Sequence, residues 1–246
     1  NLIYEREPGA LNESFADIFG TMVEKYVEPS NWNWILGSQV FNSYPFLRSM
    51  SNPHEYLQPS TYLTDFYWHD LTDSRDFYGG HTNYNDCCYV HRNSGVQNHW
   101  FYLLSDGGSQ NGVTVAAIGT DKAAKIAYYN LCFYLTAQSG YPAARNGSIS
   151  AATYLYGECS NECQQVRNAW AAVGVGTAAT PCLSAYISGP YDLMYGEEGH
   201  WEANVSGGSG NYSYSWDVEN KKYFNSSSID YNFYPVVATN YPQTLS

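Results

Sequence analysis

Residues 9–20 read GALNESFADIFG, a segment in which apolar and acidic side chains recur with the period of an α-helix. At roughly 100° per residue, Glu13, Asp17 and Glu24 fall within about 40° of one another. The opposite side gathers larger apolar side chains, which are Leu11, Phe15, Ile18, Met22 and Tyr26. The pattern therefore predicts an amphipathic helix over residues 10–28 that has one acidic face.

The acidic face of this helix has two interpretations. A solvated face is the simpler one, because carboxylates on helix surfaces usually point into water. Gly20 lies within the same stripe, although a glycine there weakens a helix by about 1 kcal/mol relative to alanine. Its position predicts that another part of the protein packs closely against Gly20.

The segment resembles the GAxNExxSDxFG helix of the thermolysin-like zinc metallopeptidases, with Ala16 where that family usually has serine. Four further blocks occur in the family's order and approximate spacing: LIY at 2–4, LRSMSNP at 47–53, VHRNSG at 90–95 and AVGV at 172–175. The resemblance implies that this part of the chain is the C-terminal helical lobe of a peptidase catalytic domain.

The resemblance makes Glu13 the third ligand of a catalytic zinc ion. Such a zinc ion is held by two histidines and one glutamate, with water in the fourth position. In the family, both histidines and the general-base glutamate come from an HExxH helix roughly twenty residues before the third ligand. No HExxH occurs in the 246 residues. We expect that the chain begins just after this motif, that the N-terminal lobe of the same enzyme is its partner, and that the chain alone is inactive.

Other residues match the family positions that stabilise the transition state. His91 resembles the transition-state histidine, and Asp86, five residues earlier, resembles the carboxylate that orients its ring. Tyr4 matches a second donor to the oxyanion, since its phenol is neutral near pH 7. Arg48 matches the arginine that donates to the substrate carbonyl, where a planar fork of donors is suitable. Without the resemblance, His91 would be interpreted as an ordinary loop residue and Tyr4 as an aromatic side chain that covers the helix. Arg48 would be interpreted as the ion-pair partner of a nearby carboxylate.

Two further assignments follow from the resemblance. Asp17 would accept a hydrogen bond from a zinc-bound histidine and so orient that ligand. Leu36, Val40 and Leu47 occupy positions that form the apolar primed-side pocket in the family, which implies cleavage before a bulky hydrophobic residue. Three aliphatic side chains could equally belong to a core.

The chain departs from the family pattern at the calcium site. Glu24 matches one ligand of the paired calcium site, but the following loop, residues 31–38, has no carboxylate. Calcium binds several oxygen ligands, most of them anionic. We therefore expect that the double site is not intact, and that a single calcium ion bound through Glu24 and carbonyl oxygens remains possible.

His54 and the cysteines give less specific information about structure and function. His54-Glu55 is not a zinc motif, because the second histidine at i+4 is absent, and His54 is predicted to be a surface loop residue. Cys87 and Cys88 replace a Gly-Gly pair of the family and could form a vicinal bridge or pair elsewhere. Cys159 and Cys163 flank a short turn that a local disulfide could close.

The composition agrees with a secreted enzyme. The chain has six cysteines and a formal net charge of -12, with 11 lysine and arginine residues. Disulfides persist mainly outside the cytosol. The acidic balance makes nucleic acid or an anionic membrane an improbable partner, and the longest apolar stretch, around residues 126–135, is too short to span a bilayer. We expect a polypeptide substrate and a monomer.

The sequence divides near residue 177. Before it, helical patterns cover residues 10–28, 93–105, 122–137, 143–156 and 161–173, with a long loop region at 29–90. We expect a mainly α-helical lobe over residues 1–176 and a linker at 177–184. Alternating apolar and polar residues then predict a small all-β module at 185–246, resembling an incomplete immunoglobulin-like or polycystic-kidney-disease-like sandwich.

Two functions from different classes therefore remain. The first is part of a secreted zinc metalloendopeptidase. The second is a non-catalytic module that binds protein or glycan through aromatic side chains such as Trp201 and Trp216, although buried core positions suit these two tryptophans better. The family order of Glu13, Arg48 and His91 favours the first, whereas the absence of HExxH favours the second.

Overall fold

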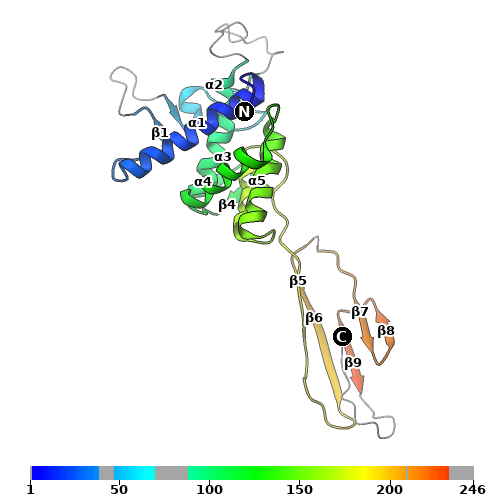
Figure 1. Cartoon of the computed structure of the whole chain (residues 1–246). Coiled ribbons are helices and arrows are strands. Elements are labelled where there is room, and N and C mark those ends of the chain that lie inside the picture. The colour runs from blue at the N-terminus through cyan, green and yellow to red at the C-terminus, as the bar shows by residue number, and fades with distance from the viewer. Residues whose placement is uncertain (1, 39–46, 70–87, 209, 233–246) are drawn as a thin grey trace. The chain divides into compact units, whose positions relative to one another are not determined.

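The structure is a computed structural model that describes residues 2–38, 47–69, 88–208 and 210–232 (Figure 1). The chain divides into two compact units, residues 1–179 and 180–246, which are described separately below. The first unit is mainly helical, and the described residues of the second form only strands and loops. The change from helical to strand patterns that the sequence predicts is therefore present in the fold.

Helix α1 (Arg6–Val27) forms from the segment that opened the sequence analysis. Its apolar side is buried as predicted at Leu11, Phe15 and Ile18. Tyr26, which was grouped with them, is instead 88% exposed. The acidic side is not uniformly solvated, since Asp17 is only 6% exposed.

The remaining helices follow the predicted order with shifted ends. They are α2 (Val90–Asn93), α3 (Gly95–Asp106), α4 (Thr120–Tyr129), α5 (Tyr141–Tyr156) and α6 (Asn161–Ala172). The pattern expected at 122–137 ends as an α-helix at Tyr129 and continues as a π-helix, η2 (Asn130–Tyr134). None of the helices within the described ranges combines the length and apolarity needed to cross a membrane.

Short strands and one 3₁₀-helix occupy the long loop region and the α3–α4 connection. Strand β1 (Ile35–Leu36) pairs antiparallel with β2 (Arg48–Ser49), so that Leu36 lies opposite Arg48. The 3₁₀-helix η1 (Pro53–Tyr56) follows directly. Strands β3 (Gly108–Gln110) and β4 (Val113–Val115) form a second antiparallel pair. The β1–β2 pairing places Arg48 on a fixed backbone rather than on a free loop.

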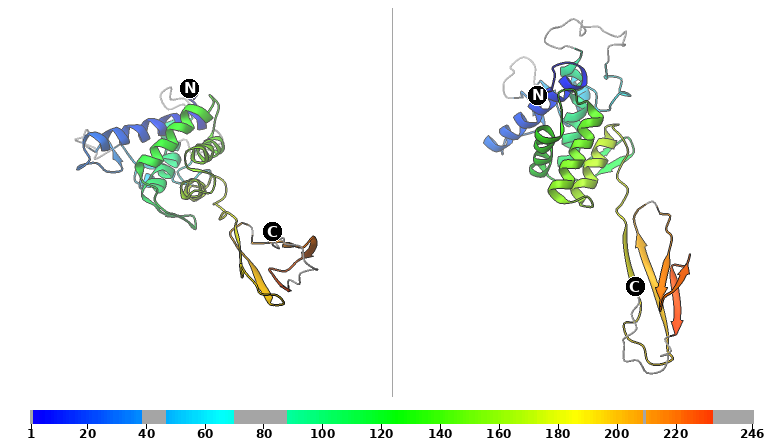
Figure 2. Two further views of the ribbon diagram at one scale, coloured as in Figure 1. Left: turned by 60° about the horizontal axis from the view of Figure 1, so that its bottom comes forward. Right: turned by 45° about the vertical axis from the view of Figure 1, so that its right-hand side comes forward.

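The core of the helical unit is centred on α3. Trp100 on α3 stacks on Trp170 of α6 with ring centroids 4.7 Å apart, and both side chains are almost completely buried. Tyr141 at the start of α5 is also fully buried and donates its hydroxyl to the carbonyl of Asn93 at 2.6 Å. Helix α1 contacts α2, α3 and α4, and Figure 2 shows it crossing the other helices of this unit. The packing therefore holds both α1 and α2 against α3.

Two glycines on α1 have opposite surroundings. A Cβ atom on Gly9 would lie 2.5 Å from Cγ1 of Val90, so this glycine allows α1 and α2 to approach closely. A Cβ atom on Gly20 would have nothing within 4 Å. The prediction that something packs closely against Gly20 is therefore wrong for the described structure, and the close approach occurs three turns earlier.

The second unit consists of two small antiparallel sheets. Strand β6 (Glu198–Ser206) lies between β5 (Ser184–Ser188) and β9 (Ser228–Asn232), while β7 (Ser215–Val218) pairs with β8 (Lys221–Phe224). Trp201 and Trp216 are 7% and 3% exposed and form a core with Val218 and Ile229. The strands are as predicted, whereas the immunoglobulin-like sandwich stays a prediction. The two tryptophans are core residues and not a binding face.

The cysteines correct two predictions. Cys159 and Cys182 are disulfide-bonded, while Cys88, Cys132 and Cys163 carry thiols. A local bridge between Cys159 and Cys163 is therefore wrong, because Cys163 is fully buried on the core side of α6 whereas Cys159 lies in an exposed turn. The vicinal bridge is also excluded, since Cys88 carries a thiol; Cys87 itself lies outside the described residues.

Candidate active site

Tyr4, Glu13 and His91 meet at the start of α1. The hydroxyl of Tyr4 donates to Oε1 of Glu13 at 2.7 Å and lies 3.1 Å from Nε2 of His91. Nε2 of His91 is also 3.3 Å from Oε2 of Glu13. Because the phenol has one hydrogen and gives it to Glu13, its oxygen accepts from Nε2–H of His91. The structure therefore brings together three residues that the sequence predicted from separate blocks.

Arg48 joins this group to a buried carboxylate. Its Nη1 lies 2.6 Å from Oδ1 of Asp17, and its Nη2 lies 3.4 Å from Oε2 of Glu13. Arg48 is 8% exposed and Asp17 is 6% exposed. One guanidinium thus bridges two carboxylates that stand one helical turn apart on α1, which is the spacing seen in the sequence.

The environment of Asp17 opposes its ionisation only in part. Burial raises the pKa of Asp17, while the nearby Arg48 charge and the hydrogen bonds from Arg48 and Asn98 lower it, and the net direction is upward. Nδ2 of Asn98 donates to Oδ2 of Asp17 at 2.7 Å, and Oδ1 of Asn98 accepts from Ser14 at 2.8 Å. Each carboxylate oxygen retains a lone pair after these bonds, so Asp17 can accept one further donor.

The backbone of His91 is fixed by Gln58, which the sequence did not single out. Nε2 of Gln58 donates to the carbonyl of His91 at 2.6 Å, and the Ser94 hydroxyl donates to the same carbonyl at 2.8 Å. Gln58 is 4% exposed. A Cβ atom on Gly95 would lie 2.8 Å from Cβ of Gln58, so glycine is required there for the two segments to meet. Gln58 was missed because its contact is long-range and has no local sequence pattern.

Helix α2 begins from an unusual backbone. Cys88 and Tyr89 both have positive φ values, 67° and 65°, in the left-handed region. Such conformations cost non-glycine residues roughly 1–2 kcal/mol each. The resemblance noted above places a Gly-Gly pair at 87–88 in the family, so Cys88 adopts a conformation that glycine would adopt without strain. Asp86, the predicted orienting carboxylate of His91, lies outside the described residues.

The predicted substrate pocket is only partly described. Leu36 and Leu47 lie beside Arg48, because the amide of Leu47 donates to the carbonyl of Leu36 at 2.7 Å in the β1–β2 hairpin. Leu47 is 49% exposed and Leu36 is half-buried. Val40 lies outside the described residues. The hairpin thus presents two of the three aliphatic side chains next to the arginine.

The predicted calcium ligand lies apart from this group. Glu24 is near the end of α1, half-buried, and its carbonyl accepts from the amide of Glu28. The following loop is held by Trp34, whose Nε1 donates to Oδ2 of Asp106 at 2.6 Å. Within residues 2–38, 47–69, 88–208 and 210–232, no group of three or more His, Cys, Asp or Glu side chains is arranged to hold a metal ion. The calcium site stays a prediction.

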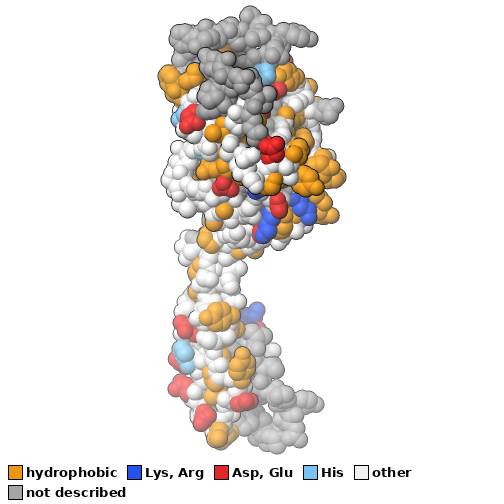
Figure 3. Space-filling view, turned by 90° about the vertical axis from the view of Figure 1, so that its left-hand side faces the viewer, with side chains coloured by type: hydrophobic (Ala, Val, Ile, Leu, Met, Phe, Trp, Pro, Cys, Tyr) orange, Lys and Arg blue, Asp and Glu red, His pale blue; other side chains and the backbone are white. Residues whose placement is uncertain are grey.

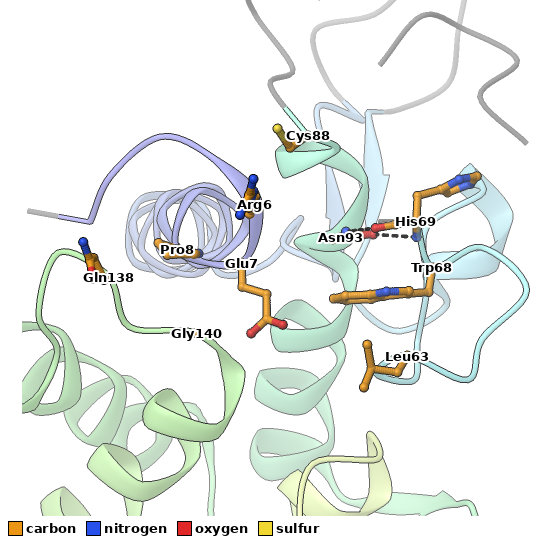
Figure 4. A pocket seen from close by; sticks show the side chains of 10 residues that line it. All are labelled: Arg6, Glu7, Pro8, Leu63, Trp68, His69, Cys88, Asn93, Gln138 and Gly140. Carbon is orange, nitrogen blue, oxygen red and sulfur yellow. Dashed lines mark hydrogen bonds between the residues drawn. The ribbon is translucent and has the colours of Figure 1, made fainter. Parts of the chain in front are cut away.

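A cavity of about 590 Å³ lies beside the first turn of α1 (Figure 4). Glu7, Leu63, Trp68 and Asn93 line it, and Figure 4 shows the Glu7 carboxylate and the Trp68 ring pointing into it. Asn93 is two residues after His91 and therefore faces the other side of α2. Glu7 accepts from the Tyr62 hydroxyl at 2.7 Å and from the Tyr141 amide at 2.9 Å. Glu7 is thus bound to the scaffold, and the cavity is separate from the Tyr4–Glu13–His91 group.

A second cavity, of about 500 Å³, contains His54. Nε2 of His54 lies 2.7 Å from Oδ2 of Asp65, and half of the His54 side chain is exposed. Burial would raise the pKa of Asp65, but hydrogen bonds from His54 and from the amides of Tyr67 and Ser60 outweigh it and hold the pKa below its usual value. His54 is at the surface as predicted, but it lies in the 3₁₀-helix η1 rather than in a loop, and its contact with Asp65 connects η1 to the following loop.

Comparisons with known proteins identify the family to which this part of the chain is similar. A family model described as "Thermolysin metallopeptidase, alpha-helical domain" matches residues 1–175. The chain is 41% identical over 177 residues to bacillolysin of Bacillus caldolyticus and to thermolysin of Alicyclobacillus acidocaldarius subsp. acidocaldarius, covering 71% of this chain and 30% of each relative. It is 36% identical over 177 residues to neutral protease B of Bacillus subtilis (strain 168), covering 71% of this chain and 29% of that relative.

The matched region contains every member of the Tyr4–Glu13–Arg48–His91 group and ends at residue 175, close to the end of the helical unit at residue 179. The chain spans about 30% of the length of these relatives, so the match concerns one domain of a larger enzyme type. Through residues 1–175, this chain belongs to the thermolysin metallopeptidase family as its α-helical domain.

Proposed function

We propose that the helical unit supplies one side of the active site of a secreted zinc metalloendopeptidase. The observation that supports this most strongly is the direct connection of Tyr4, Glu13, His91 and Arg48 through contacts of 2.7–3.4 Å. These residues come from four separate parts of the sequence. A structural core would not require an arginine, a histidine and a phenol to converge on one carboxylate.

The residues present fit a zinc ion in part. The Glu13 carboxylate is 19% exposed on a rigid helix, and carboxylate oxygen is a suitable zinc ligand. Two histidine ligands would come from outside the described residues, since a single carboxylate cannot hold zinc tightly. A zinc ion bound there would supply Lewis acidity and an activated water molecule. We therefore propose that the 246-residue chain is inactive alone and works with an N-terminal lobe.

His91 and Tyr4 would stabilise negative charge that develops on the substrate carbonyl oxygen. Each has one polar hydrogen beside Glu13, which it donates within the group in this structure and would turn toward the substrate oxygen, and both side chains are partly exposed, so that a substrate can reach them. Preorganised donors of this kind contribute roughly 3–4 kcal/mol each to transition-state stabilisation. The carbonyl of His91 is held by Gln58 and Ser94, which limits movement of the ring. Asp86 would orient the same ring.

Arg48 and Asp17 would position substrate and metal ligand. The Arg48 guanidinium is anchored on Asp17, which leaves donors for a substrate carbonyl. Asp17 retains acceptor capacity for an N–H of a zinc-bound histidine. We further propose that Leu36, Val40 and Leu47 select a bulky hydrophobic residue after the cleaved bond, and that Glu24 contributes to a single calcium site.

The test compares two acidic residues on the same helix. Protein produced from the complete reading frame is assayed for zinc content and for cleavage of a fluorogenic peptide. Glu13→Gln is expected to lose bound zinc and at least about 100-fold in kcat/KM, because a neutral amide replaces an anionic ligand. Glu24→Gln, about three turns along α1, is the control for zinc binding and should keep its zinc.

Two results would contradict the proposal. The first is a full-length protein that binds no zinc and cleaves no peptide. The second is a Glu13→Gln variant that retains both zinc and activity. The alternative function does not use Trp201 and Trp216 as its binding face, because both side chains are buried.

A further inference from the structure

The β unit has two fully exposed strands with different chemistry. Every residue of β5 and every residue of β8 is exposed. Strand β8 reads KKYF and so contains Lys221 and Lys222, whereas β5 reads SAYIS and has no charged residue. Natural proteins commonly place lysine on exposed sheet edges to prevent pairing with other chains. The edge at β8 has this protection, and the edge at β5 does not.

The backbone of β5 is available on one side. In the sheet order β5-β6-β9, β6 is the one neighbour of β5 among the described strands. Alternate N–H and C=O groups on its outer side therefore point away from the sheet. The segment from Leu183 to Ser188 contains no proline, no glycine and no charge, and it includes Tyr186 and Ile187, which favour extended structure. Such a segment pairs readily with another extended chain.

The register of β5 defines what an added strand would contact. Ile187 lies opposite Ala203, on the same face as Trp201, and is 50% exposed. On the other face, Tyr186 lies opposite Asn204 and Ser188 lies opposite Glu202. Successive side chains of an added strand would point to these two faces in turn. One set would extend the apolar face beside Ile187, and the other would lie near Tyr186 and Glu202.

The net negative charge of the β unit indicates that a partner of this unit would be positively charged. Residues 180–246 contain two lysines, Lys221 and Lys222, and no arginine. The acidic residues are more numerous: Asp192, Glu197, Glu198, Glu202, Asp217, Glu219 and Asp230. Figure 3 shows acidic and apolar side chains exposed together on this unit, at the bottom of the view. A basic segment would be attracted, whereas a second copy of the same acidic unit would be repelled.

We propose that β5 is a docking edge for an extended polypeptide segment in which apolar residues alternate with lysine or arginine. The added strand would pair its backbone with the outer side of β5, place its apolar residues beside Ile187 and place its basic residues near Glu202. The backbone hydrogen bonds would supply affinity, and the two faces would supply selectivity. This inference concerns the β unit alone and does not depend on the function proposed for the helical unit.

The test uses the 246-residue chain and a labelled peptide of eight residues that alternates valine and lysine. Fluorescence anisotropy should show saturable binding that weakens as salt is added. Ile187→Lys adds a charge to the edge and should weaken binding at least tenfold. Phe224→Lys, at a 63% exposed position of β8, makes the same kind of change on the protected edge and should alter binding less than twofold. Circular dichroism checks that both variants remain folded.

Peptide variants separate strand addition from simple charge attraction. N-methylation of alternate residues on the pairing side should abolish binding, while N-methylation of the other alternate set should leave it within twofold. A peptide with glutamate in place of lysine should not bind. The proposal is overturned if the valine–lysine peptide does not bind, if N-methylation has no effect, or if Ile187→Lys and Phe224→Lys act equally. It is also overturned if sedimentation shows a dimer that Ile187→Lys disrupts, because a second copy would then occupy the edge.

Discussion

Arg48 is the ion-pair partner of two carboxylates on α1, those of Glu13 and Asp17. Its guanidinium lies between Asp17 and Glu13 and is 8% exposed, so neither carboxylate near it is fully solvated. A buried charge that loses its partner destabilises a protein far more than an exposed one does. The pair is therefore a constraint on folding as well as a candidate part of the active site.

We predict that Arg48→Met destabilises the chain by about 3 kcal/mol, because Asp17 would be left buried without its counter-ion. Asp17→Asn in the same background removes the stranded charge and should recover part of this loss. Urea unfolding of the two single variants and the double variant measures the coupling. Free energies that simply add would show that Arg48 and Asp17 do not stabilise one another.

At the scale of single residues, the sequence predicted roles for Tyr4, Glu13, Arg48 and His91, and the structure places the other three side chains within 3.4 Å of the Glu13 carboxylate. The reason is that each belongs to a short block that could be matched locally. Gln58 and Asn98 were not identified, although they fix His91 and Asp17. Their importance comes from partners 33 and 81 residues away in the chain, and no local pattern encodes such contacts.

Helix α1 is the element that organises the helical unit. It contributes Glu13 and Asp17 to the candidate site, and it lies against α2, which contains His91. Its two glycines show which part of the helix is constrained by packing. Gly9 faces Val90 of α2 closely, whereas Gly20 faces open space. The sequence predicted a constraint at Gly20 because a glycine inside a helix suggests close packing, but propensity alone does not reveal which glycine is packed.

We predict opposite effects for alanine at these two positions. Gly20→Ala should stabilise the chain by up to about 1 kcal/mol, because alanine favours the helix and its methyl group meets nothing. Gly9→Ala should destabilise it, because the methyl group would overlap Cγ1 of Val90 and force α1 away from α2. Thermal unfolding of the two variants shows whether each substitution raises or lowers the melting temperature. A Gly20→Ala variant that melts below the parent would mean that another segment covers this position.

The ends of the helices show why element boundaries were less well predicted than the elements. Helix α1 begins at Arg6, four residues before the expected start, because the apolar pattern that defines the prediction begins later than the backbone hydrogen bonds. The predicted helix over 122–137 changes to a π-helix at Asn130, whose Nδ2 donates to the carbonyl of Ala144. This contact with α5 joins residues 14 positions apart and is not visible in the local apolar pattern.

For the whole molecule, the change from helical to alternating sequence patterns near residue 177 predicted two units. The chain divides into compact units between residues 179 and 180. Helical periodicity and strand alternation are local properties, and so this division is readable from sequence. The disulfide state was not readable, since no local pattern distinguishes Cys163, which carries a thiol, from Cys159, which is disulfide-bonded. The acidity of the chain was readable and bears on its response to pH.

His99 connects segments that are far apart in the sequence. From α3, its Nδ1 lies 3.0 Å from the carbonyl of Met50, and its Nε2 lies 2.7 Å from Oε1 of Gln110. Gln110 in turn donates to the carbonyl of Ser60 at 2.9 Å. Burial lowers the pKa of His99, while the hydrogen bonds to Met50 and Gln110 act in the opposite direction and are outweighed. The folded protein therefore holds His99 neutral at pH values where the unfolded chain already protonates it.

We predict that His99 contributes to acid lability. Because its pKa is lower in the folded state than the usual 6.5, the unfolded state binds the proton first as the pH falls. Stability should therefore decrease from about pH 6.5 downward, by at most about 1.4 kcal/mol per pH unit, and level off below the folded pKa. The free energy of unfolding in urea, measured between pH 7.5 and pH 5 in steps of about half a pH unit, tests this prediction.

A neutral replacement isolates this effect from the rest of the molecule. The net charge of -12 shrinks as the pH approaches the isoelectric point near 4.7, which reduces self-repulsion and stabilises the fold. The difference between the parent and His99→Gln removes that shared contribution. The parent should lose more stability than His99→Gln as the pH falls from 7 to 5. The reverse order would mean that His99 is held as a cation between the two oxygen acceptors of Met50 and Gln110, because a doubly protonated ring alone can donate to both.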